Sequence, residues 1–136
     1  MFKKNKVPKY RNTKVEFDGV KFDSKREKDR YVFLKQKEAE GVISHLKLQP
    51  KYELIPAIKE TYTKQLKTKT KECERTVQFA ITYHADFEYY KDGQVITEDV
   101  KISKHLLPKE FSLKFKLFFW KYNRKIKLVF KADEDV

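Results

Sequence analysis

Two aspartates and a lysine, Asp86, Asp99 and Lys101, stand at spacings that allow them to act together. Asp86 follows the run ITYHA, and Asp99 and Lys101 lie in the run VITEDVK. Between the two runs stands Asp92-Gly93, a dipeptide that favours a two-residue hairpin turn. A hairpin with that turn places Asp86 directly opposite Asp99. Because side chains alternate along a strand, Lys101 then lies on the same face as Asp99.

This arrangement predicts a metal site. Two like charges directly opposite each other destabilise a strand pair, and a divalent cation between them reverses that effect. Mg²⁺ or Mn²⁺ takes oxygen ligands, and the ammonium of Lys101 would orient water or stabilise transition-state charge. The three residues therefore indicate phosphodiester hydrolysis. The alternative is that Asp86 and Asp99 are solvated charges, with Lys101 paired to Asp99.

The net charge of +12 points to a polyanion partner. Residues 1–14 carry six basic and no acidic side chains, and residues 102–131 carry nine basic and one acidic. The Lys-rich segment 59–75 is a further candidate for phosphate contacts. The alternative is a basic protein without such a partner. The residues predicted to contact nucleic acid are Lys9, Arg11, Lys14, Lys114, Lys116, Lys121 and Arg124.

Composition argues against several classes of protein. The single cysteine, Cys73, excludes an internal disulfide framework and fits a reducing compartment. There is no signal-like segment and no apolar run of membrane-spanning length. Three glycines without a phosphate-binding loop argue against a nucleotide cofactor. We therefore expect a soluble cytoplasmic protein without a membrane partner.

The order of predicted elements is that of an α/β domain. Residues 1–13 are expected to form a flexible basic arm, 14–131 a single domain, and 132–136 a frayed acidic tail. Within the domain we predict a hairpin around Asp18-Gly19, a helix over 24–40 that Gly41 ends, strands at 43–48 and 51–55, a surface loop or ribbon over 57–73, a long or broken strand over 74–90 that pairs with 94–102, a helix over 109–123 and a strand at 125–130.

The second predicted helix has two apolar stripes on roughly opposite sides. The first contains Phe111, Phe115, Phe118, Phe119 and Tyr122, and the second contains Leu113, Leu117 and Trp120. Such a helix is buried twice. Either a loop or a second subunit covers the second stripe, and we favour the subunit.

Four segments resemble a known family. FDSKRE, LQPKYEL, ITYHADFEYY and TEDVK occur in the same order in small phage-encoded proteins of the PD-(D/E)XK nuclease superfamily, many of which are described only as a domain of unknown function. The likeness runs from about Lys9 to Phe130. It implies a restriction-endonuclease-like fold, in which helices flank a central mixed sheet, here with an added N-terminal β-hairpin.

The resemblance also assigns roles. Asp86 becomes the first acid of the motif, Asp99 the second, Lys101 the motif lysine and Glu27 the acid that the first helix contributes. Ala85 departs from the proline of the motif name, and Asp99 departs from the commoner Glu.

Several residues near the motif have alternative roles. Glu27 lies three residues after Ser24, so SKRE is also a capping box in which both side chains bind backbone amides. His84, Gln49 and Glu88 are possible accessory residues. The simpler alternatives are an incidental rim histidine, a glutamine that satisfies the backbone at the Pro50 bend, and a carboxylate outside the metal site.

The function implied by the resemblance is a Mg²⁺-dependent DNA endonuclease. Short members often resolve branched DNA as symmetric dimers, which implies Holliday-junction resolution during phage recombination or replication in the host cytoplasm. The alternative is a non-catalytic DNA-binding or adaptor protein on a nuclease scaffold.

Overall fold

A mixed four-stranded sheet in the order β10–β9–β8–β3 is the centre of the fold. The structure, a computed structural model, describes residues 13–136. The predictions for residues 1–12, among them the flexible arm and the DNA-contacting roles of Lys9 and Arg11, lie outside the described residues.

The elements follow one another in nearly the predicted order. They are β1 (Val15–Phe17), β2 (Val20–Phe22), α1 (Lys25–Ala39), β3 (Ser44–Leu48), β4 (Lys51–Ile55), β5 (Ile58–Gln65), β6 (Thr70–Gln78), β7 (Ile81–His84), β8 (Phe87–Lys91), β9 (Gln94–Val100), the 3₁₀ turn η1 (Lys104–Leu106), α2 (Lys109–Tyr122) and β10 (Lys127–Val129).

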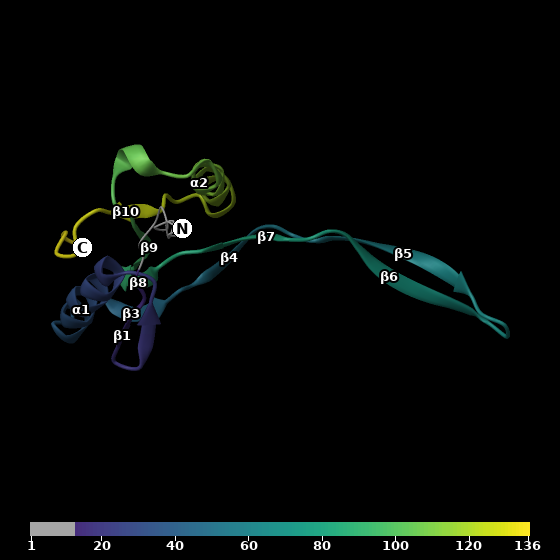
Figure 1. The fold of residues 1–136 in the computed structure, drawn as a ribbon, viewed down its shortest axis with the longest axis horizontal. Coiled ribbons are helices and arrows are strands. Elements are labelled where there is room, and N and C mark those ends of the chain that lie inside the picture. Colours follow the sequence, from purple (N-terminus) through teal and green to yellow (C-terminus); the bar gives the residue numbers. More distant parts are fainter. Residues whose placement is uncertain (1–12) are drawn as a thin grey trace, which may run out of the picture.

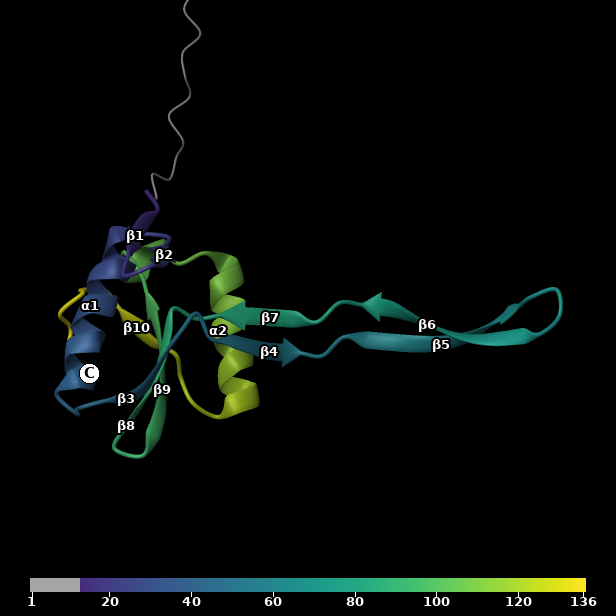
Figure 2. The same cartoon turned by 90° about the horizontal axis from the view of Figure 1, so that it is seen from below.

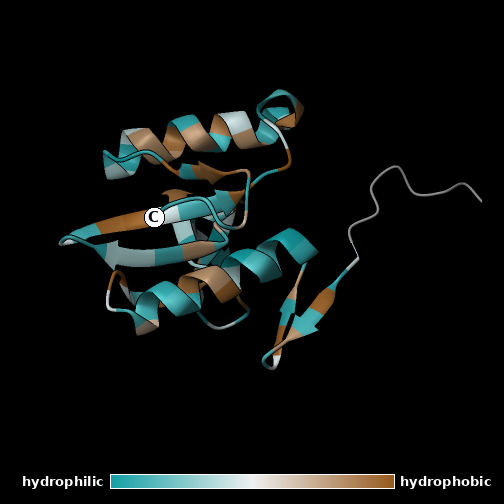
Figure 3. Ribbon diagram, turned by 90° about the vertical axis from the view of Figure 1, so that its left-hand side faces the viewer, coloured by the Kyte–Doolittle hydropathy of each residue, from teal (hydrophilic) through white to brown (hydrophobic). Residues whose placement is uncertain are grey.

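The sheet is flanked by helices. Strand β9 pairs with β8 antiparallel and with β10 parallel, and β3 pairs with β8 antiparallel. Helix α1 lies on one face and α2 on the other (Figures 1 and 3). Strands β4 and β7 form a separate antiparallel ladder that packs against α2. These observations confirm the predicted α/β class with a central mixed sheet.

Both predicted hairpin turns are present. Asp18-Gly19 and Asp92-Gly93 have positive φ at both residues, as a two-residue type I′ turn requires. The second turn sets the register of β8 and β9, in which Phe87 pairs with Glu98, as predicted.

Helix α1 contributes a buried ion pair to the core. The guanidinium of Arg30 contacts Glu98 twice, with Nε 2.9 Å from Oε2 and Nη2 2.6 Å from Oε1, and both side chains are fully buried. Tyr89 donates a further hydrogen bond to Oε1 of Glu98. A buried carboxylate needs such partners to remain charged. The pair explains why Glu98 stands on an otherwise apolar strand face.

The segment predicted as a loop or ribbon is a long ribbon. Strands β5 and β6 form an antiparallel hairpin that projects from the body as a continuation of β4 and β7 (Figures 1 and 2). It extends to Gln78, beyond the predicted limit of residue 73. The long strand predicted over 74–90 is therefore broken into the end of β6, then β7 and β8.

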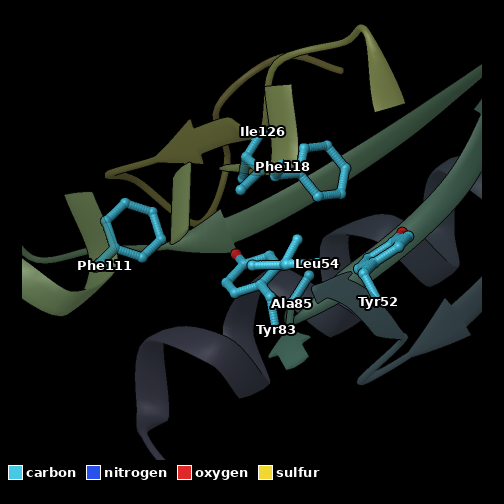
Figure 4. Close-up of a cluster of buried hydrophobic side chains, with 7 residues drawn as sticks. All are labelled: Tyr52, Leu54, Tyr83, Ala85, Phe111, Phe118 and Ile126. Atoms are coloured by element: carbon cyan, nitrogen blue, oxygen red, sulfur yellow. The ribbon is translucent and has the colours of Figure 1, made fainter. Parts of the chain in front are cut away.

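Helix α2 packs on the β4–β7 ladder, and its apolar stripes differ from the prediction. Phe111 and Phe118 are buried there with Tyr52, Leu54, Tyr83, Ala85 and Ile126 (Figure 4). Leu117, predicted on the second stripe, packs against this cluster, whereas Phe119, predicted on the first, is 45% exposed. Trp120 is 76% exposed. The buried face is therefore rotated toward Leu117, because the ladder, and not the sequence stripe, decides which side is covered.

The acidic tail, expected to be frayed, is contacted by two basic side chains. Nη1 of Arg30 donates to the carbonyl oxygen of Ala132 at 3.1 Å, and Nζ of Lys127 lies 2.6 Å from the carbonyl oxygen of Asp135. Val136 packs against the cluster beneath α1. Basic side chains from two elements thus hold the tail through its backbone carbonyls, contacts that composition does not reveal.

Neither helix of residues 13–136 has the length and apolar character that a membrane crossing needs.

Candidate active site

The strand that carries Asp86 is interrupted there. Strand β7 ends at His84 and β8 begins at Phe87. The N–H of Ala85 donates to the carbonyl oxygen of Pro50 at 3.1 Å, and the carbonyl oxygen of Asp86 accepts from the N–H of Gln49 at 2.9 Å. The two positions at which strands are interrupted, 49–50 and 85–86, therefore face each other. The N–H of Asp86 still donates to the carbonyl oxygen of Glu98 at 3.1 Å, so Asp86 lies at an irregular position next to β9.

Asp86 consequently does not form the cross-strand pair with Asp99 that the register predicted. The ladder of β8 and β9 stops at Phe87 and Glu98. Oδ2 of Asp86 instead accepts a hydrogen bond from the N–H of Val100 at 2.7 Å, one residue beyond Asp99. The side chain still reaches β9, so the two carboxylates remain neighbours without a regular pair.

Asp99 is held on both of its oxygens. Its side chain is buried, Oδ2 accepts from the phenol of Tyr83, and Oδ1 lies 3.2 Å from Nζ of Lys101. The ammonium of Lys101 also lies 4.1 Å from the centre of the Phe111 ring, within range of a cation–π contact. Strand β7, strand β9 and helix α2 together fix one carboxylate and one ammonium.

Burial and neighbouring carboxylates raise the pKa of Asp86 and of Glu27. Burial, followed by the charges of Asp99 and Glu27, raises the pKa of Asp86 to about 8. Burial and the charges of Asp23 and Asp99 raise the pKa of Glu27. Burial, followed by the charge and hydrogen bond of Asp99, raises the pKa of the Tyr83 phenol, which therefore stays a donor. Asp86 and Glu27 thus share one environment in which burial and neighbouring carboxylates favour the protonated form.

The acids open into a cleft with a volume of about 1040 Å³. The N-terminal segment, α1, β7, β9 and α2 each contribute to it. Its polar and charged lining residues are Thr13, Ser24, Lys25, Arg26, Glu27, Tyr83, His84, Asp86, Asp99, Lys101, Glu110 and Lys114. All four residues predicted as catalytic therefore line one cleft.

Glu27 combines the two roles that the sequence left as alternatives. Its backbone N–H donates to Oγ of Ser24 at 3.2 Å, so Ser24 caps α1 as predicted. Its carboxylate lines the cleft and lies close enough to Asp86 for its charge to affect the pKa there. Ser24 thus binds only the backbone N–H of Glu27, which leaves the Glu27 side chain at the cleft.

The described residues contain no group of three His, Cys, Asp or Glu side chains gathered closely enough to hold a metal ion by themselves. Asp86 and Asp99 are the neighbouring pair, and Glu27 does not complete a third ligand in this arrangement. Mg²⁺ commonly keeps several waters and takes one or two carboxylates together with substrate phosphates. The half-buried Asp86 and the buried Asp99, whose charges repel each other, fit that mode of binding.

The three accessory residues have different positions. His84 is exposed and lines the cleft. In the β4–β7 ladder its cross-strand partner is Lys51, not Lys101. Gln49 contacts Asp86 only through its backbone, and its side chain is exposed outside the cleft lining. Glu88 accepts from the phenol of Tyr52 and is likewise absent from the lining. Only His84 remains near the site.

The predicted DNA-contacting residues also differ among themselves. Lys14 and Lys116 are exposed, and Lys114 lines the cleft at 3.0 Å from Glu110. Lys121 binds the carbonyl oxygen of Glu53 at 2.6 Å. Arg124 is half-buried, with Nη1 2.6 Å from Oγ1 of Thr97 and its guanidinium above the Phe118 ring. Arg124 is therefore part of the core packing.

Sequence reasoning missed Tyr83, Lys25 and Arg26, which also line the cleft. Tyr83 lies three residues before Asp86, where a strand would turn it to the opposite face; the break at Ala85 brings both to one cleft. Lys25 and Arg26 precede Glu27 in the first turn of α1. Their position next to Glu27, an expected site acid, was the feature of the sequence that could have identified them.

One comparison with known proteins gave a match. A family model described as a protein of unknown function (DUF1064) matches residues 7–134, nearly the whole chain, and the chain belongs to that family. No curated protein and no solved structure matched.

Proposed function

We propose that this member of the DUF1064 family is a metal-dependent DNA endonuclease with the site organisation of the PD-(D/E)XK superfamily. The observation that carries the proposal is the convergence of Asp86, Asp99 and Lys101 in one cleft of a basic protein. A helix-borne acid, Glu27, reaches the same cleft. The central mixed sheet between two helices is compatible with the restriction-endonuclease-like fold that the sequence motifs resemble.

Mg²⁺ or Mn²⁺ fits the donor set. Asp86 and Asp99 would hold it, because a cation compensates the burial and the neighbouring acidic charges that raise the pKa of Asp86. The ion, when bound, would supply Lewis-acid polarisation of the phosphodiester and of water. Glu27, which lines the same cleft without completing a three-ligand group, would contact the ion through water. Nucleotide cofactors have no part in the proposal.

Residues around the acids would orient Asp99 and the attacking water. Tyr83 and Lys101 fix the two oxygens of Asp99 in a single orientation. The ammonium of Lys101, held between Asp99 and the Phe111 ring, would orient the attacking water or stabilise negative charge that develops on the phosphate. Water would form a bond to phosphorus while the bond from phosphorus to a deoxyribose oxygen breaks. The proton that the water loses would end on that oxygen, which leaves a hydroxyl on one fragment and a phosphate on the other.

The substrate class that we propose is branched DNA, including Holliday junctions, in phage recombination or replication. The test is cleavage of a synthetic four-way junction and of a linear duplex of matched sequence, with Mg²⁺ and with EDTA. We expect Mg²⁺-dependent cutting of the junction above that of the duplex. Asp99→Asn should abolish cutting, whereas Asp92→Asn should not, because Asp92 lies in an exposed turn where asparagine keeps the required backbone. Absence of cutting, or cutting by Asp99→Asn, contradicts the proposal.

A homodimer is part of the proposal because junction resolution requires two opposed cuts. The exposed apolar side chains of Leu113 and Trp120 on α2 support it. Sedimentation equilibrium of the wild type and of Trp120→Glu is the measurement. We expect the wild type to be a dimer and Trp120→Glu to be a monomer. A wild type that is monomeric both alone and on DNA contradicts the proposed dimer.

One observation favours a second candidate function. The described residues lack a three-ligand metal group, which is compatible with a non-catalytic DNA-binding or adaptor protein. That function predicts salt-sensitive DNA binding that does not require Mg²⁺, with no strand cleavage. The cleavage assay above, combined with a binding assay in EDTA, separates the two candidates.

A further inference from the structure

No other element of the described residues packs against the β5–β6 ribbon to stabilise it. It has eight cross-strand pairs, yet every residue of β5 and all of β6 except the half-exposed Cys73 are exposed. It projects away from the body with no element on either face (Figures 1 and 2). An isolated two-stranded hairpin is marginally stable in water. A ribbon of this length is therefore expected to lie against a partner.

The outer half of the ribbon is strongly basic. Between Glu60 and Glu72 the chain carries four lysines, Lys64, Lys67, Lys69 and Lys71, and no acid. Lys64 and Lys71 are directly paired across the strands. Like charges in that position destabilise a hairpin. The lysines in the turn, Lys67 and Lys69, add to the repulsion.

The inner half of the ribbon differs because its basic side chains have acidic partners. Nζ of Lys59 lies 3.2 Å from Oε1 of Glu74, and Arg75 pairs with Glu60. Arg75 also lies above the Tyr62 ring. Uncompensated positive charge is thus confined to the distal end, where it is available to an external anion.

We infer that the distal ribbon, Lys64 to Lys71, binds the phosphate backbone of duplex DNA outside the cleft, with the two strands lying in or along a groove. This inference rests on the proposed function and specifies how the substrate is held. A two-stranded β-ribbon has dimensions that the major groove of B-DNA admits. Lysines along the ribbon would neutralise phosphates and remove the repulsion between Lys64 and Lys71. A second copy of this chain is a poorer partner, because its own net charge is +12.

The position of the ribbon relative to the site supports this role. Strand β7 continues from β6 toward the body and ends two residues before Asp86. The ladder of β4 and β7, anchored beneath α2, thus connects the ribbon to the acids. Contacts at the distal end would fix a flank of the DNA about 25 Å from the ladder, since each strand residue spans about 3.3 Å.

The first experiment compares two variants with the same loss of charge. The ribbon variant replaces Lys64, Lys67, Lys69 and Lys71 with glutamine. The control replaces Lys35, Lys37, Lys47 and Lys131, none of which lines the cleft. Binding to a linear duplex of about 30 base pairs is measured by fluorescence anisotropy in EDTA at several salt concentrations. Each lost phosphate contact lowers the slope of log K against log salt by about 0.9.

In the ribbon variant we expect the slope to fall by about two to four units and the affinity at moderate salt to fall about tenfold or more. Both losses should be larger than those of the control variant. Equal losses in both variants overturn the inference. Because the assay needs no cutting, a protein without nuclease activity still tests it. Conversely, junction cleavage that persists in the ribbon variant at saturating protein leaves the proposed function intact.

A second variant separates loss of binding from unfolding of the ribbon. Lys64→Glu creates an opposite-charge pair with Lys71, which stabilises a hairpin where the native pair destabilises it. The melting temperature should be unchanged or higher while DNA affinity falls several-fold, more than for Lys131→Glu. Full affinity in Lys64→Glu overturns the inference. So does a change from dimer to monomer at unchanged DNA affinity, which would make the ribbon a subunit contact.

Discussion

The phenol of Tyr83 donates a hydrogen bond to Oδ2 of Asp99, and both side chains are buried. The remaining oxygen, Oδ1, faces Lys101. The orientation of one proposed metal ligand is therefore set by a tyrosine that belongs to the hydrophobic cluster beneath α2. Packing of that cluster and geometry of the site are coupled through this bond.

Replacement of Tyr83 by phenylalanine tests that coupling. The ring, and with it the packing against Phe111 and Phe118, is retained, while Asp99 loses one of its two orienting partners. We expect the affinity for Mn²⁺ to fall by about 10- to 100-fold, the usual cost of losing a partner of a metal ligand. Titration of the melting temperature with Mn²⁺ measures this without cutting. Tyr122→Phe, a tyrosine of the same cluster that bonds to the Glu53 carbonyl, is the control. Equal Mn²⁺ affinity in Tyr83→Phe and wild type contradicts the positioning role.

The pKa of Asp86 predicts how stability depends on pH. A carboxyl whose pKa is raised by folding binds its proton more tightly in the folded chain. Its stabilising contribution is complete at low pH and is lost as pH rises from the ordinary value toward about 8. In EDTA we therefore expect a lower melting temperature at pH 8.5 than at pH 6, and in Asp86→Asn a flatter dependence with higher stability at pH 8.5.

Divalent cations should reverse this loss because they bind the ionised form. The rise in melting temperature on adding Mg²⁺ should be larger at pH 8.5 than at pH 6, and it should be absent in Asp86→Asn. Asp92→Asn, which changes an exposed turn carboxylate, should behave as wild type in both respects. The assignment fails if Asp86→Asn keeps the pH dependence and the Mg²⁺ response of the wild type.

Lys101 should affect turnover and not metal binding. Its ammonium contacts one oxygen of Asp99 and is not itself a metal ligand. In Lys101→Met we expect junction cutting to fall by about 10²- to 10³-fold, the cost of losing one charge-stabilising donor, while the Mg²⁺-induced rise in melting temperature persists. Lys114→Met removes a second cation of the same cleft, one that is paired with Glu110, and should cost much less. Similar losses of cutting in the two variants would show that general positive charge, not the position of Lys101, is what matters.

The buried pair of Arg30 and Glu98 should contribute to stability and not to chemistry. Removal of one partner leaves an uncompensated buried charge, so Arg30→Met should lower the free energy of unfolding by about 3–5 kcal/mol. Arg30→Met combined with Glu98→Leu should recover part of that loss, because two apolar side chains replace the whole pair. Urea unfolding of the single and double variants measures both. A double variant less stable than Arg30→Met would contradict this account.

The local elements could be predicted from the sequence because their determinants are local. Asp92-Gly93 and Asp18-Gly19 favour one turn type, and Ser24 and Gly41 mark the ends of α1. The spacing of Asp99 and Lys101 on one strand likewise placed them on one face. Turn type and strand alternation depend on a few neighbouring residues, so the candidate acids and lysine could be identified before any packing was known.

What only the tertiary structure decided depends on contacts between distant segments. The interruption of the strand at 85–86, where the chain bonds to Gln49 and Pro50, leaves Asp86 outside the regular ladder and Tyr83 in contact with Asp99. Arg30 of α1 explains the buried Glu98 and holds the acidic tail, which composition predicted to be frayed. The sequence by itself determined which residues were available for chemistry and the local structure around them. Packing decided their partners and protonation, because burial and neighbouring charge arise only when segments far apart in the chain meet.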